Sequence, residues 1–404
     1  MLGLGELYLP AFALVLGARP FEVGLLTTVP MLVGSFFQLV APGLARRTGN
    51  RAWVVGSAVL QALTFLPILG LGVSGGGYGW LLAWVCVYWA LALGIGPAWN
   101  DWMGRMVPEA VRGRYFGRRN GWLQASLLAA LLLAGLIVQA ATGTRFGATA
   151  GFVLIFALAL LLRLASAGFL ALQHEPAVKS VDQPTAVRPR RKLRPGHPAF
   201  RVVGVLVLVT GAVNISAAYF TPYMLEELKL SYIEFTILNV VMVLARIVSA
   251  RRWSEIAHRF GNRRVLQVAG TLVVPLAAMW VVSDNFFWLI ALQTVAGFAW
   301  AGFDLALILN LLDCTDDDDR ATVLSTYTLL NGLGIVLGSL LGGAILEALG
   351  NSGYHVIFIL SSSIRLLTML LLGRGTGRKR PGEHSFSDVF VRVVSPRPGK
   401  RAAH

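Results

Sequence analysis

Long apolar stretches separated by short polar segments follow one another along the whole chain. A helix that crosses a bilayer needs about 20 apolar residues, and inside lipid the backbone must satisfy its own hydrogen bonds. The pattern predicts twelve such helices, near residues 1–18, 21–45, 52–73, 79–104, 119–142, 148–172, 200–224, 232–250, 263–283, 285–311, 322–348 and 354–373. We therefore expect an all-α membrane protein with twelve transmembrane helices.

The composition agrees with a chain whose main solvent is lipid. Of the 404 residues, 56% are hydrophobic and 14% are charged, whereas soluble domains carry about 25% charged residues. The two cysteines, Cys86 and Cys314, lie in an apolar run and beside an acidic loop, so we expect neither a disulfide framework nor a metal site. No cofactor is expected. The first residues lack the basic segment and cleavage site of a secretory signal and are expected to be part of the structure.

The positive charge is distributed unevenly between the connections. If both termini are cytoplasmic, the inside segments hold 29 of the 35 Lys and Arg residues. The others lie in outside loops or within predicted helices: Arg19, Arg145, Lys229, Arg163, Arg246 and Arg365. Because cytoplasmic loops are enriched in Lys and Arg, we expect a multi-pass protein of the cytoplasmic (inner) membrane with both termini inside. The net charge of +15 then belongs to loops that face anionic lipid headgroups, and nucleic acid is not an expected partner.

Two basic segments divide the chain. Residues 173–199 hold six basic residues and five prolines and are expected to be a solvated cytoplasmic linker. The predicted organisation is thus a six-helix bundle at 1–172, the linker, a second six-helix bundle at 200–373 and a basic cytoplasmic tail at 374–404. In the tail, Phe386, Val389, Phe390, Val393 and Val394 recur at helical spacing. This spacing is typical of a short interfacial helix; a disordered tail is the alternative.

A short basic turn occurs once in each predicted bundle. "LARRTGNR" at 44–51 returns as "IAHRFGNR" at 256–263, with five of the eight positions identical. The same offset of 212 residues aligns Pro10 with Pro222 and Glu22 with Glu234. Two six-helix units in parallel topology with a long central loop are one of the internal-repeat architectures of secondary transporters. The sequence therefore predicts two pseudo-symmetric six-helix bundles.

These turns resemble the signature of the major facilitator superfamily, roughly G-x-L-A-D-R-x-G-R-K after its second helix. The first copy keeps Leu44, Ala45, Arg47 and Gly49, but Arg46 stands in place of the Asp, as His258 does in the second copy. The "RGRYFGRR" loop at 112–119 also resembles bacterial members. In that family the turn latches the cytoplasmic ends of the two halves, and Asp101 and Asp313 are the substitute acceptors expected here. The residues implied in this gate are Gly43, Arg47, Gly49, Asp101, Arg105, Arg112, Arg259, Gly261, Asp313 and Arg320. The alternative is that the basic residues only enforce topology.

The same resemblance implies a central cavity lined by the predicted helices at 1–18, 79–104, 200–224 and 285–311. Their polar and aromatic residues are the cavity candidates: Glu6, Tyr88, Trp89, Asn214, Tyr219, Trp300 and Asp304. Glu6 lies eleven residues before Gly17, about 16 Å from the outer end. It is the first candidate for a proton-binding carboxylate, and Asp304 is the second. The alternatives are an interfacial residue at the helix start for Glu6 and a structural carboxylate for Asp304.

Other charged groups are expected to have structural roles. Arg163 and Arg365 lie within predicted helices that are peripheral in the family, which favours snorkelling or a structural ion pair over substrate binding. The acidic run 316–319 lacks the ligand spacing and central Gly of a calcium loop and is expected to be a solvated turn.

The function expected from these features is secondary active transport of a small solute by alternating access, coupled to an ion, with the proton favoured. The protein is expected to be a monomer. The alternative is a membrane assembly or scaffold protein on the same fold, with a sealed cavity and dispensable Glu6 and Asp304. An intramembrane enzyme is disfavoured, because the six histidines lie in loops, the tail or helix ends.

Overall fold

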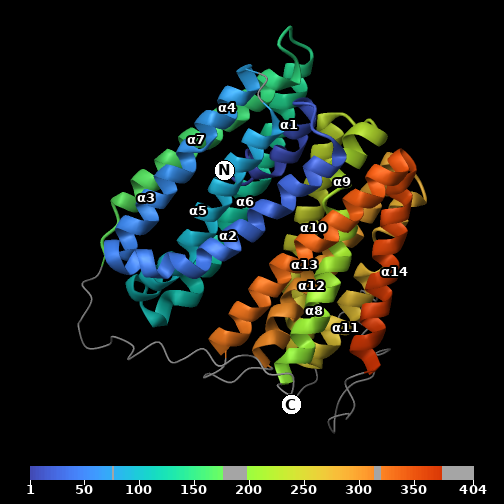
Figure 1. The fold of residues 1–404 in the computed structure, drawn as a ribbon. Helices are drawn as coiled ribbons and strands as arrows, with labels where there is room; N and C mark the ends of the chain where they lie inside the picture. The colour runs from blue at the N-terminus through green and yellow to red at the C-terminus, as the bar shows by residue number, and fades with distance from the viewer. Residues whose placement is uncertain (75–76, 176–197, 314–319, 375–404) are drawn as a thin grey trace. The chain divides into compact units, whose positions relative to one another are not determined.

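The structure, a computed structural model, describes residues 1–74, 77–175, 198–313 and 320–374. All regular elements in these ranges are helical, with η marking 3-10 and π turns (Figure 1). In chain order they are η1 (Glu6–Tyr8), α1 (Leu9–Val15), α2 (Pro20–Thr48), α3 (Asn50–Leu63), α4 (Phe65–Ser74), α5 (Tyr78–Met106), α6 (Glu109–Thr142), α7 (Gly147–Ala171), α8 (Pro198–Ala217), α9 (Phe220–Pro222), η2 (Tyr223–Glu227), α10 (Tyr232–Phe260), α11 (Asn262–Val273), η3 (Ala278–Val281), α12 (Phe286–Asp313), α13 (Arg320–Leu349), η4 (Gly350–Ser352) and α14 (Gly353–Arg374).

These elements account for the predicted crossings. Ten ranges among the described residues are long and apolar enough to cross a membrane. One of them, Thr326–Leu370, contains most of both α13 and α14, and the shorter apolar segment Glu6–Val15 corresponds to the first predicted helix. Each of the twelve predicted crossings therefore coincides with helical structure, and the predicted all-α fold class is confirmed.

Two helices extend beyond their predicted spans. α6 begins at Glu109 rather than at 119, and α10 continues to Phe260 rather than ending at 250. The added turns are rich in charged residues, which end an apolar span but are compatible with a helix in water. Hydropathy therefore predicted the membrane-crossing part of these helices and not their full length.

Four predicted crossings are interrupted, each just before a proline. The breaks separate η1 from α1, α3 from α4, α8 from α9 and α11 from η3, and they precede Pro10, Pro67, Pro222 and Pro275. Proline has no N–H to donate to the carbonyl four residues earlier, and its ring clashes with that carbonyl. The matching positions of Pro10 and Pro222 give the first helix of each predicted half a break at the same place.

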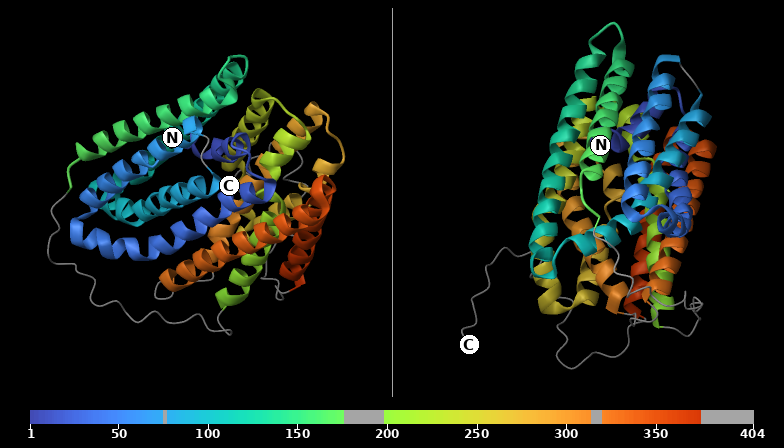
Figure 2. Two further views of the ribbon diagram at one scale, coloured as in Figure 1. Left: turned by 45° about the horizontal axis from the view of Figure 1, so that its top comes forward. Right: turned by 90° about the vertical axis from the view of Figure 1, so that its left-hand side faces the viewer.

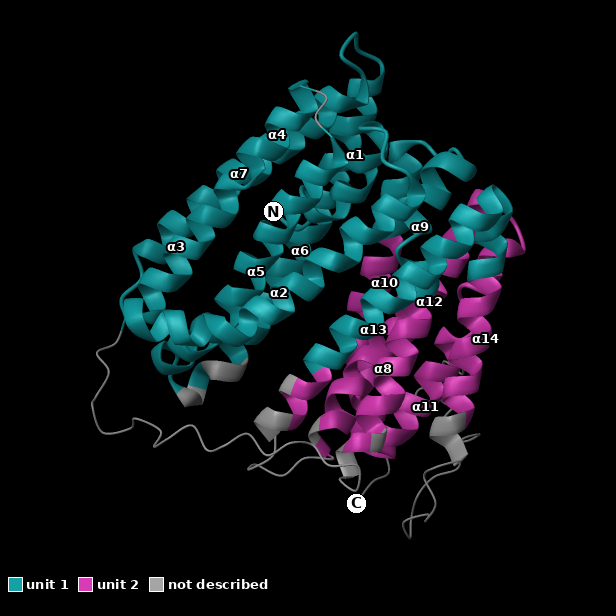
Figure 3. Cartoon of the chain, viewed as in Figure 1, with its two compact units in different colours: residues 1–191, 214–240, 328–357 teal, residues 192–213, 241–327, 358–404 magenta. Residues whose placement is uncertain are grey.

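The described chain separates into two compact units (Figure 3). Unit 1 comprises residues 1–191, 214–240 and 328–357, and unit 2 comprises residues 192–213, 241–327 and 358–404. Within unit 1, α2 packs on α5, α3 packs on α5 and α7, and α6 packs on α7, with their axes running roughly side by side (Figure 2). Within unit 2, α11 packs on α12. The division into bundles at 1–172 and 200–373 stays a prediction. The linker between 176 and 197, the acidic run 316–319 and the tail from 375 lie outside the described residues.

An aromatic core fills unit 1 around its first helical segment. Six of its rings are fully buried and contact one another with centroids 5.1–6.4 Å apart: Tyr8, Phe12, Phe65, Tyr88, Phe152 and Phe156. Such pairs contribute about 0.5–1.5 kcal/mol beyond their area burial. The core reaches the η1 turn, because the ring of Phe65 lies so close to Gly5 that a Cβ there would be 2.8 Å from it. The turn that carries Glu6 is thus held by closely packed rings.

The repeated basic turn has the same backbone in both copies. Gly49 has φ 87° and ψ 148°, and Gly261 has φ 85° and ψ 149°. In each copy the glycine N–H donates to the carbonyl four residues earlier, of Ala45 or Ala257, at 2.9 Å. The turn ends α2 and starts α3 in the first copy, and ends α10 and starts α11 in the second. A positive φ with an extended ψ is essentially restricted to glycine, which explains why glycine occurs at both places.

We expect Gly49→Ala and Gly261→Ala each to destabilise the protein by about 1–3 kcal/mol, because a Cβ strains this backbone. The measurement is thermal unfolding of the purified protein in detergent. Gly56→Ala is the matched control: Gly56 lies within α3 with open space around its Cα, so the substitution should leave stability unchanged or raise it. Equal melting temperatures for all three variants would contradict the assignment of strain to the two turns.

Candidate functional site

An asparagine follows the glycine in each basic turn and binds a carboxylate from another helix. The Nδ2 of Asn50 donates to Oδ2 of Asp101 on α5 at 2.5 Å. The Nδ2 of Asn262 donates to Oδ2 of Asp313 on α12 at 2.7 Å. The two bonds join residues 51 positions apart in both copies. Each turn is therefore tied to the end of a neighbouring helix of its own half by the same hydrogen bond.

The arginines of the predicted gate differ in their hydrogen bonds and ion pairs. Arg105 pairs with Asp101 one turn earlier on α5, at 2.5 Å. No hydrogen bond or ion pair of Arg47 or Arg259 is found with the described residues, and both side chains are exposed. The two carboxylates expected to accept from these arginines accept instead from the asparagines. Gly43 lies in α2 with open space around it, and the side chains of Arg112 and Arg320 lie outside what the structure describes.

Glu6 lies in a buried polar group of unit 1. It accepts a hydrogen bond from the hydroxyl of Tyr88 on α5, whose side chain is fully buried. Arg163 of α7 interacts electrostatically with both, as the amino group of Met1 does with Glu6. Within the described chain, Nε of Arg163 is buried and finds no hydrogen-bond acceptor. Glu6 and Tyr88, two separate cavity candidates from the sequence, are thus hydrogen-bonded to each other.

Arg163 and Arg365 lie within membrane-spanning helices, and the structure shows which way each side chain is directed. The helix face places Arg163, and hydrogen bonds place Arg365. Arg163 shares a face of α7 with Phe156, Ala159 and Ala167, which are all buried. Residues three, four or seven positions apart lie on one side of a helix, so Arg163 faces the interior of unit 1. Arg365 is 3% exposed and donates to the carbonyls of Val273 and Val213. Snorkelling to the membrane surface therefore describes neither residue.

Asp304 is paired with an arginine that sequence analysis had not connected to it. Asp304 on α12 accepts a hydrogen bond from Arg246 on α10, and the two form an ion pair inside the apolar part of both helices. Their side chains are 48% and 43% exposed, so the pair lies at a surface of unit 2. α10 and α12 approach closely there, because a Cβ on Gly297 would overlap the backbone of α10. A signal was present in the sequence, since Asp304 and two arginines, Arg246 and Arg365, lay at membrane depth in the same half.

The remaining cavity candidates differ in how far they are buried and in what they contact. Tyr219 is fully buried, and its hydroxyl donates to the carbonyl of Ser339. Trp89 contacts the ring of Tyr88, and Trp300 contacts the ring of Phe303. Asn214 is half-buried and has partners of its own. In the described part of the chain, no three His, Cys, Asp or Glu side chains come together as metal ligands.

Contacts within unit 1 join the two halves of the sequence at their predicted outer ends. The hydroxyl of Tyr8 and Oγ1 of Thr236 on α10 are 2.6 Å apart, and a Cβ on Gly135 of α6 would overlap Thr236. The ring of Tyr219 lies against Gly24 of α2. These contacts consist of hydroxyl groups and close packing at glycine. Thr236 does not stand out in the sequence, because a single threonine in an apolar helix is not unusual.

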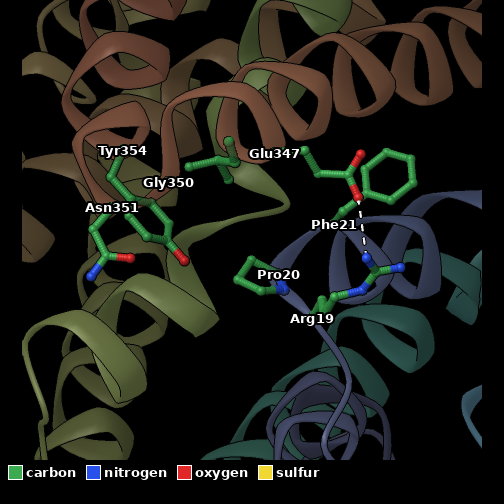
Figure 4. A pocket seen from close by; sticks show the side chains of 8 residues that line it. Arg19, Pro20, Phe21, Glu347, Gly350, Asn351 and Tyr354 are labelled. Carbon is green, nitrogen blue, oxygen red and sulfur yellow. Dashed lines mark ion pairs between the residues drawn. The ribbon is translucent and has the colours of Figure 1, made fainter.

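A pocket of about 470 Å³ lies at the same end of unit 1 (Figure 4). One wall is formed by Arg19, Pro20 and Phe21 at the start of α2, and the other by residues between 346 and 354 at the junction of α13 and α14. Arg19 and Glu347 form an ion pair across it, with 3.9 Å between Nη1 and Oε1. Tyr354 lies on the opposite side of the pocket from this pair.

Comparison with known proteins matches this fold to transporters. The family model described as "Major Facilitator Superfamily" matches residues 6–251 and 202–400. A curated relative, Protein ZINC INDUCED FACILITATOR 1 of Arabidopsis thaliana, is 24% identical over 173 residues. That alignment covers 40% of this chain and spans 35% of the relative's length.

Solved structures align over nearly the whole chain. The nucleoside transporter NupG aligns with a TM-score of 0.69 at 12% identity, covering 93% of this chain and 96% of NupG. A bacterial homologue of the human lysosomal transporter Spinster, in an inward-facing and occupied conformation, gives 0.67 at 14%, covering 98% and 94%. A bacterial homologue of the iron transporter ferroportin, in an inward-facing state, gives 0.64 at 16%, covering 93% and 95%. At these identities the likeness shows the shared fold.

We expect the charges of Arg246 and Asp304 to be coupled. Arg246→Met alone leaves a carboxylate without its counter-ion at membrane depth, so it should destabilise unit 2 more than the double variant Arg246→Met/Asp304→Asn. Because both side chains are nearly half exposed, the coupling free energy should be on the order of 1 kcal/mol. The measurement is a double-mutant cycle by thermal unfolding.

The matched control for this cycle is the pair Arg251–Glu255 on the same helix α10. Its atoms are 3.2 Å apart, but the side chains are 90% and 60% exposed, so its coupling should be close to zero. Additive effects of the two substitutions at Arg246 and Asp304, as in the control, would show that the pair is not an interacting unit.

Proposed function

Because the chain belongs to the Major Facilitator Superfamily, we propose that it is a secondary active transporter that moves a small solute by alternating access, coupled to protons through Glu6. Membrane transport itself is the activity that the family and the aligned transporters support. The solute is proposed as a small molecule without further identification, because the aligned proteins carry the names of different cargoes, nucleosides and iron among them.

The observation that carries the coupling proposal is the environment of Glu6. A carboxylate inside a membrane-spanning segment is costly unless it is paired or serves a function. Glu6 is held by one hydroxyl, that of Tyr88, and Arg163 interacts with it electrostatically without forming an ion pair within the described chain. A carboxylate with one hydrogen-bond donor and no ion pair can exist in both protonation states, whereas a tightly paired one stays ionised.

Alternating access is supported by the kind of contacts that join the two sequence halves in unit 1. Tyr8 and Thr236 contribute hydroxyl groups, Tyr219 packs against Gly24, and the ion pair of Arg19 with Glu347 is exposed. A hydrogen bond between neutral groups contributes about 0.5–1.5 kcal/mol net, and an exposed ion pair about 0–1 kcal/mol. A closed outer end built in this way can separate without loss of structure inside either half.

The proposal for the membrane setting follows from charge. The protein is placed in the cytoplasmic membrane as a monomer, with both termini inside and its basic loops against anionic headgroups. The outer ends are then those at Arg19, Arg145 and Lys229. The basic turns at Gly49 and Gly261 are on the cytoplasmic side, where we propose that their arginines and the carboxylates Asp101 and Asp313 belong to the inner gate.

Gly135→Val tests whether the outer end opens. The added side chain would overlap Thr236, so the closed outer arrangement should be disfavoured. The reporter is Thr28→Cys, in a background with serine at positions 86 and 314. Thr28 is 2% exposed on α2, one turn after Gly24, and should be shielded in the closed state. We expect an impermeant maleimide added from outside to label this cysteine several times faster when position 135 is valine.

The matched control is Gly121→Val on the same helix, where nothing lies within 4 Å of the added Cβ. Its labelling rate should equal that of the parent. If valine at position 135 leaves the labelling rate unchanged while the protein remains folded, closure of the outer end through Thr236 is not part of the cycle.

Glu6→Gln tests proton coupling. A solute that raises the unfolding temperature at two pH values is first identified from a panel and then used with protein reconstituted in liposomes. The substitution keeps the shape and a hydrogen-bond acceptor for Tyr88 but removes the titratable group, so solute-driven proton movement should be abolished. Glu255→Gln, an exposed residue of α10, should retain it. Proton movement equal to that of the parent would remove Glu6 from the mechanism.

A further inference from the structure

The outer pocket has the size of a ligand site and takes no part in the proposed coupling. Its volume of about 470 Å³ falls within the range of small-molecule pockets, about 300–1,000 Å³. Its walls come from the start of α2 and from the α13–α14 junction, which are more than 300 residues apart in sequence (Figure 4). All of its residues belong to unit 1.

Carboxylates outnumber cations around this pocket. Glu347 lines it, and Arg19 lies between Glu347 at 3.9 Å and Glu22 at 3.8 Å. Two carboxylates, Glu347 and Glu22, therefore lie beside one guanidinium at this pocket, whereas the chain as a whole carries a charge of +15. A concave site with an excess of one charge concentrates ligands of the opposite charge.

Aromatic rings complete the site. Phe21 lines one wall, and Tyr354, which is 3% exposed, lines the other. The ring of Tyr354 is in turn contacted by that of Tyr223, with centroids 5.1 Å apart. The faces of such rings attract cations, and their apolar area accommodates the body of an organic ligand.

We propose that this pocket binds a small organic cation, an ammonium group on an apolar body, with the charge at Glu347 and the body against Phe21 and Tyr354. The occupant contacts α2 on one side and the α13–α14 junction on the other. A ligand that binds one arrangement of two walls stabilises that arrangement. The bound cation therefore holds the predicted outer end closed, and this role goes beyond the proposed transport cycle because it does not require that the cation be transported.

The test uses the purified full-length protein and two probes, phenethylammonium chloride and sodium phenylacetate. The probes share a phenyl body and differ in the sign of their charge. Binding is measured by isothermal titration calorimetry and by the shift of the unfolding temperature. We expect saturable binding of phenethylammonium, weakened by added salt, and no saturable binding of phenylacetate.

Two substitutions at the ion pair give opposite expected results. Glu347→Gln removes the anionic partner and should raise the dissociation constant for phenethylammonium by about tenfold or more. Arg19→Gln removes the competing cation and should lower it. The matched control is Asp284→Asn, an exposed carboxylate in the connection before α12 and outside the pocket, which should leave the constant unchanged.

Absence of saturable phenethylammonium binding to the parent protein would overturn the proposal. So would binding of phenylacetate that is lost in Arg19→Gln, because this would make the pocket an anion site. Equal affinities for phenethylammonium in the parent and in Glu347→Gln would place the cation elsewhere. None of these outcomes depends on transport, so they are separate from the tests of Glu6 and of Gly135.

Discussion

A polar group inside the membrane has to find its partner within the protein, because lipid offers none. Three groups in this chain meet that constraint in different ways. Arg365 is buried and donates to backbone carbonyls. Arg246 and Asp304 neutralise each other at a half-exposed surface of unit 2. Glu6 has one hydroxyl donor and interacts electrostatically with the amino group of Met1 and with Arg163, without an ion pair among the described residues. In the first two arrangements the charged groups are bonded to carbonyls or to an opposite charge, and the third is the one that leaves room for a change of charge.

The contacts inside each half of the sequence differ in kind from those that join the halves in unit 1. Within the halves, the bonds Asn50–Asp101 and Asn262–Asp313 repeat at equivalent positions and tie each basic turn to a neighbouring helix. Between the halves, Tyr8 contacts Thr236 and Tyr219 lies against Gly24, which are neutral groups, and the ion pair of Arg19 with Glu347 is exposed. This contrast is what rigid halves with a separable outer end require, and it is the physical basis of the proposed alternating access.

The sequence predicted the crossings well because the length of an apolar stretch is a local property. It predicted the repeated turn for the same reason: Gly49 and Gly261 are required by their backbone conformation, which is local. The ends of α6 and α10 were wrong by about ten residues, because charged residues end a span without ending a helix. The family resemblance was confirmed by the match over residues 6–251 and 202–400.

Partners across the fold were harder to predict. Arg246 and Asp304 are 58 residues apart, and nothing local connects them. Tyr8 and Thr236 are 228 residues apart, and neither carries a charge that would single it out. Asp101 and Asp313, the acceptors expected for Arg47 and Arg259, accept instead from Asn50 and Asn262, whose shorter side chains already lie at the start of the following helix. Which side chain reaches an acceptor depends on the three-dimensional arrangement of the helices, and the spacing of residues along the sequence does not give that arrangement.

Single-molecule Förster resonance energy transfer between dyes at positions 145 and 229 would test the central claim most directly, because both positions are exposed and lie at the outer ends of different predicted halves of the sequence. The account predicts two interconverting populations in lipid nanodiscs: a near one that corresponds to the closed outer contacts and a far one in which Tyr8 and Thr236 have separated. A single unchanging population, at every pH and with every solute that binds, would contradict it.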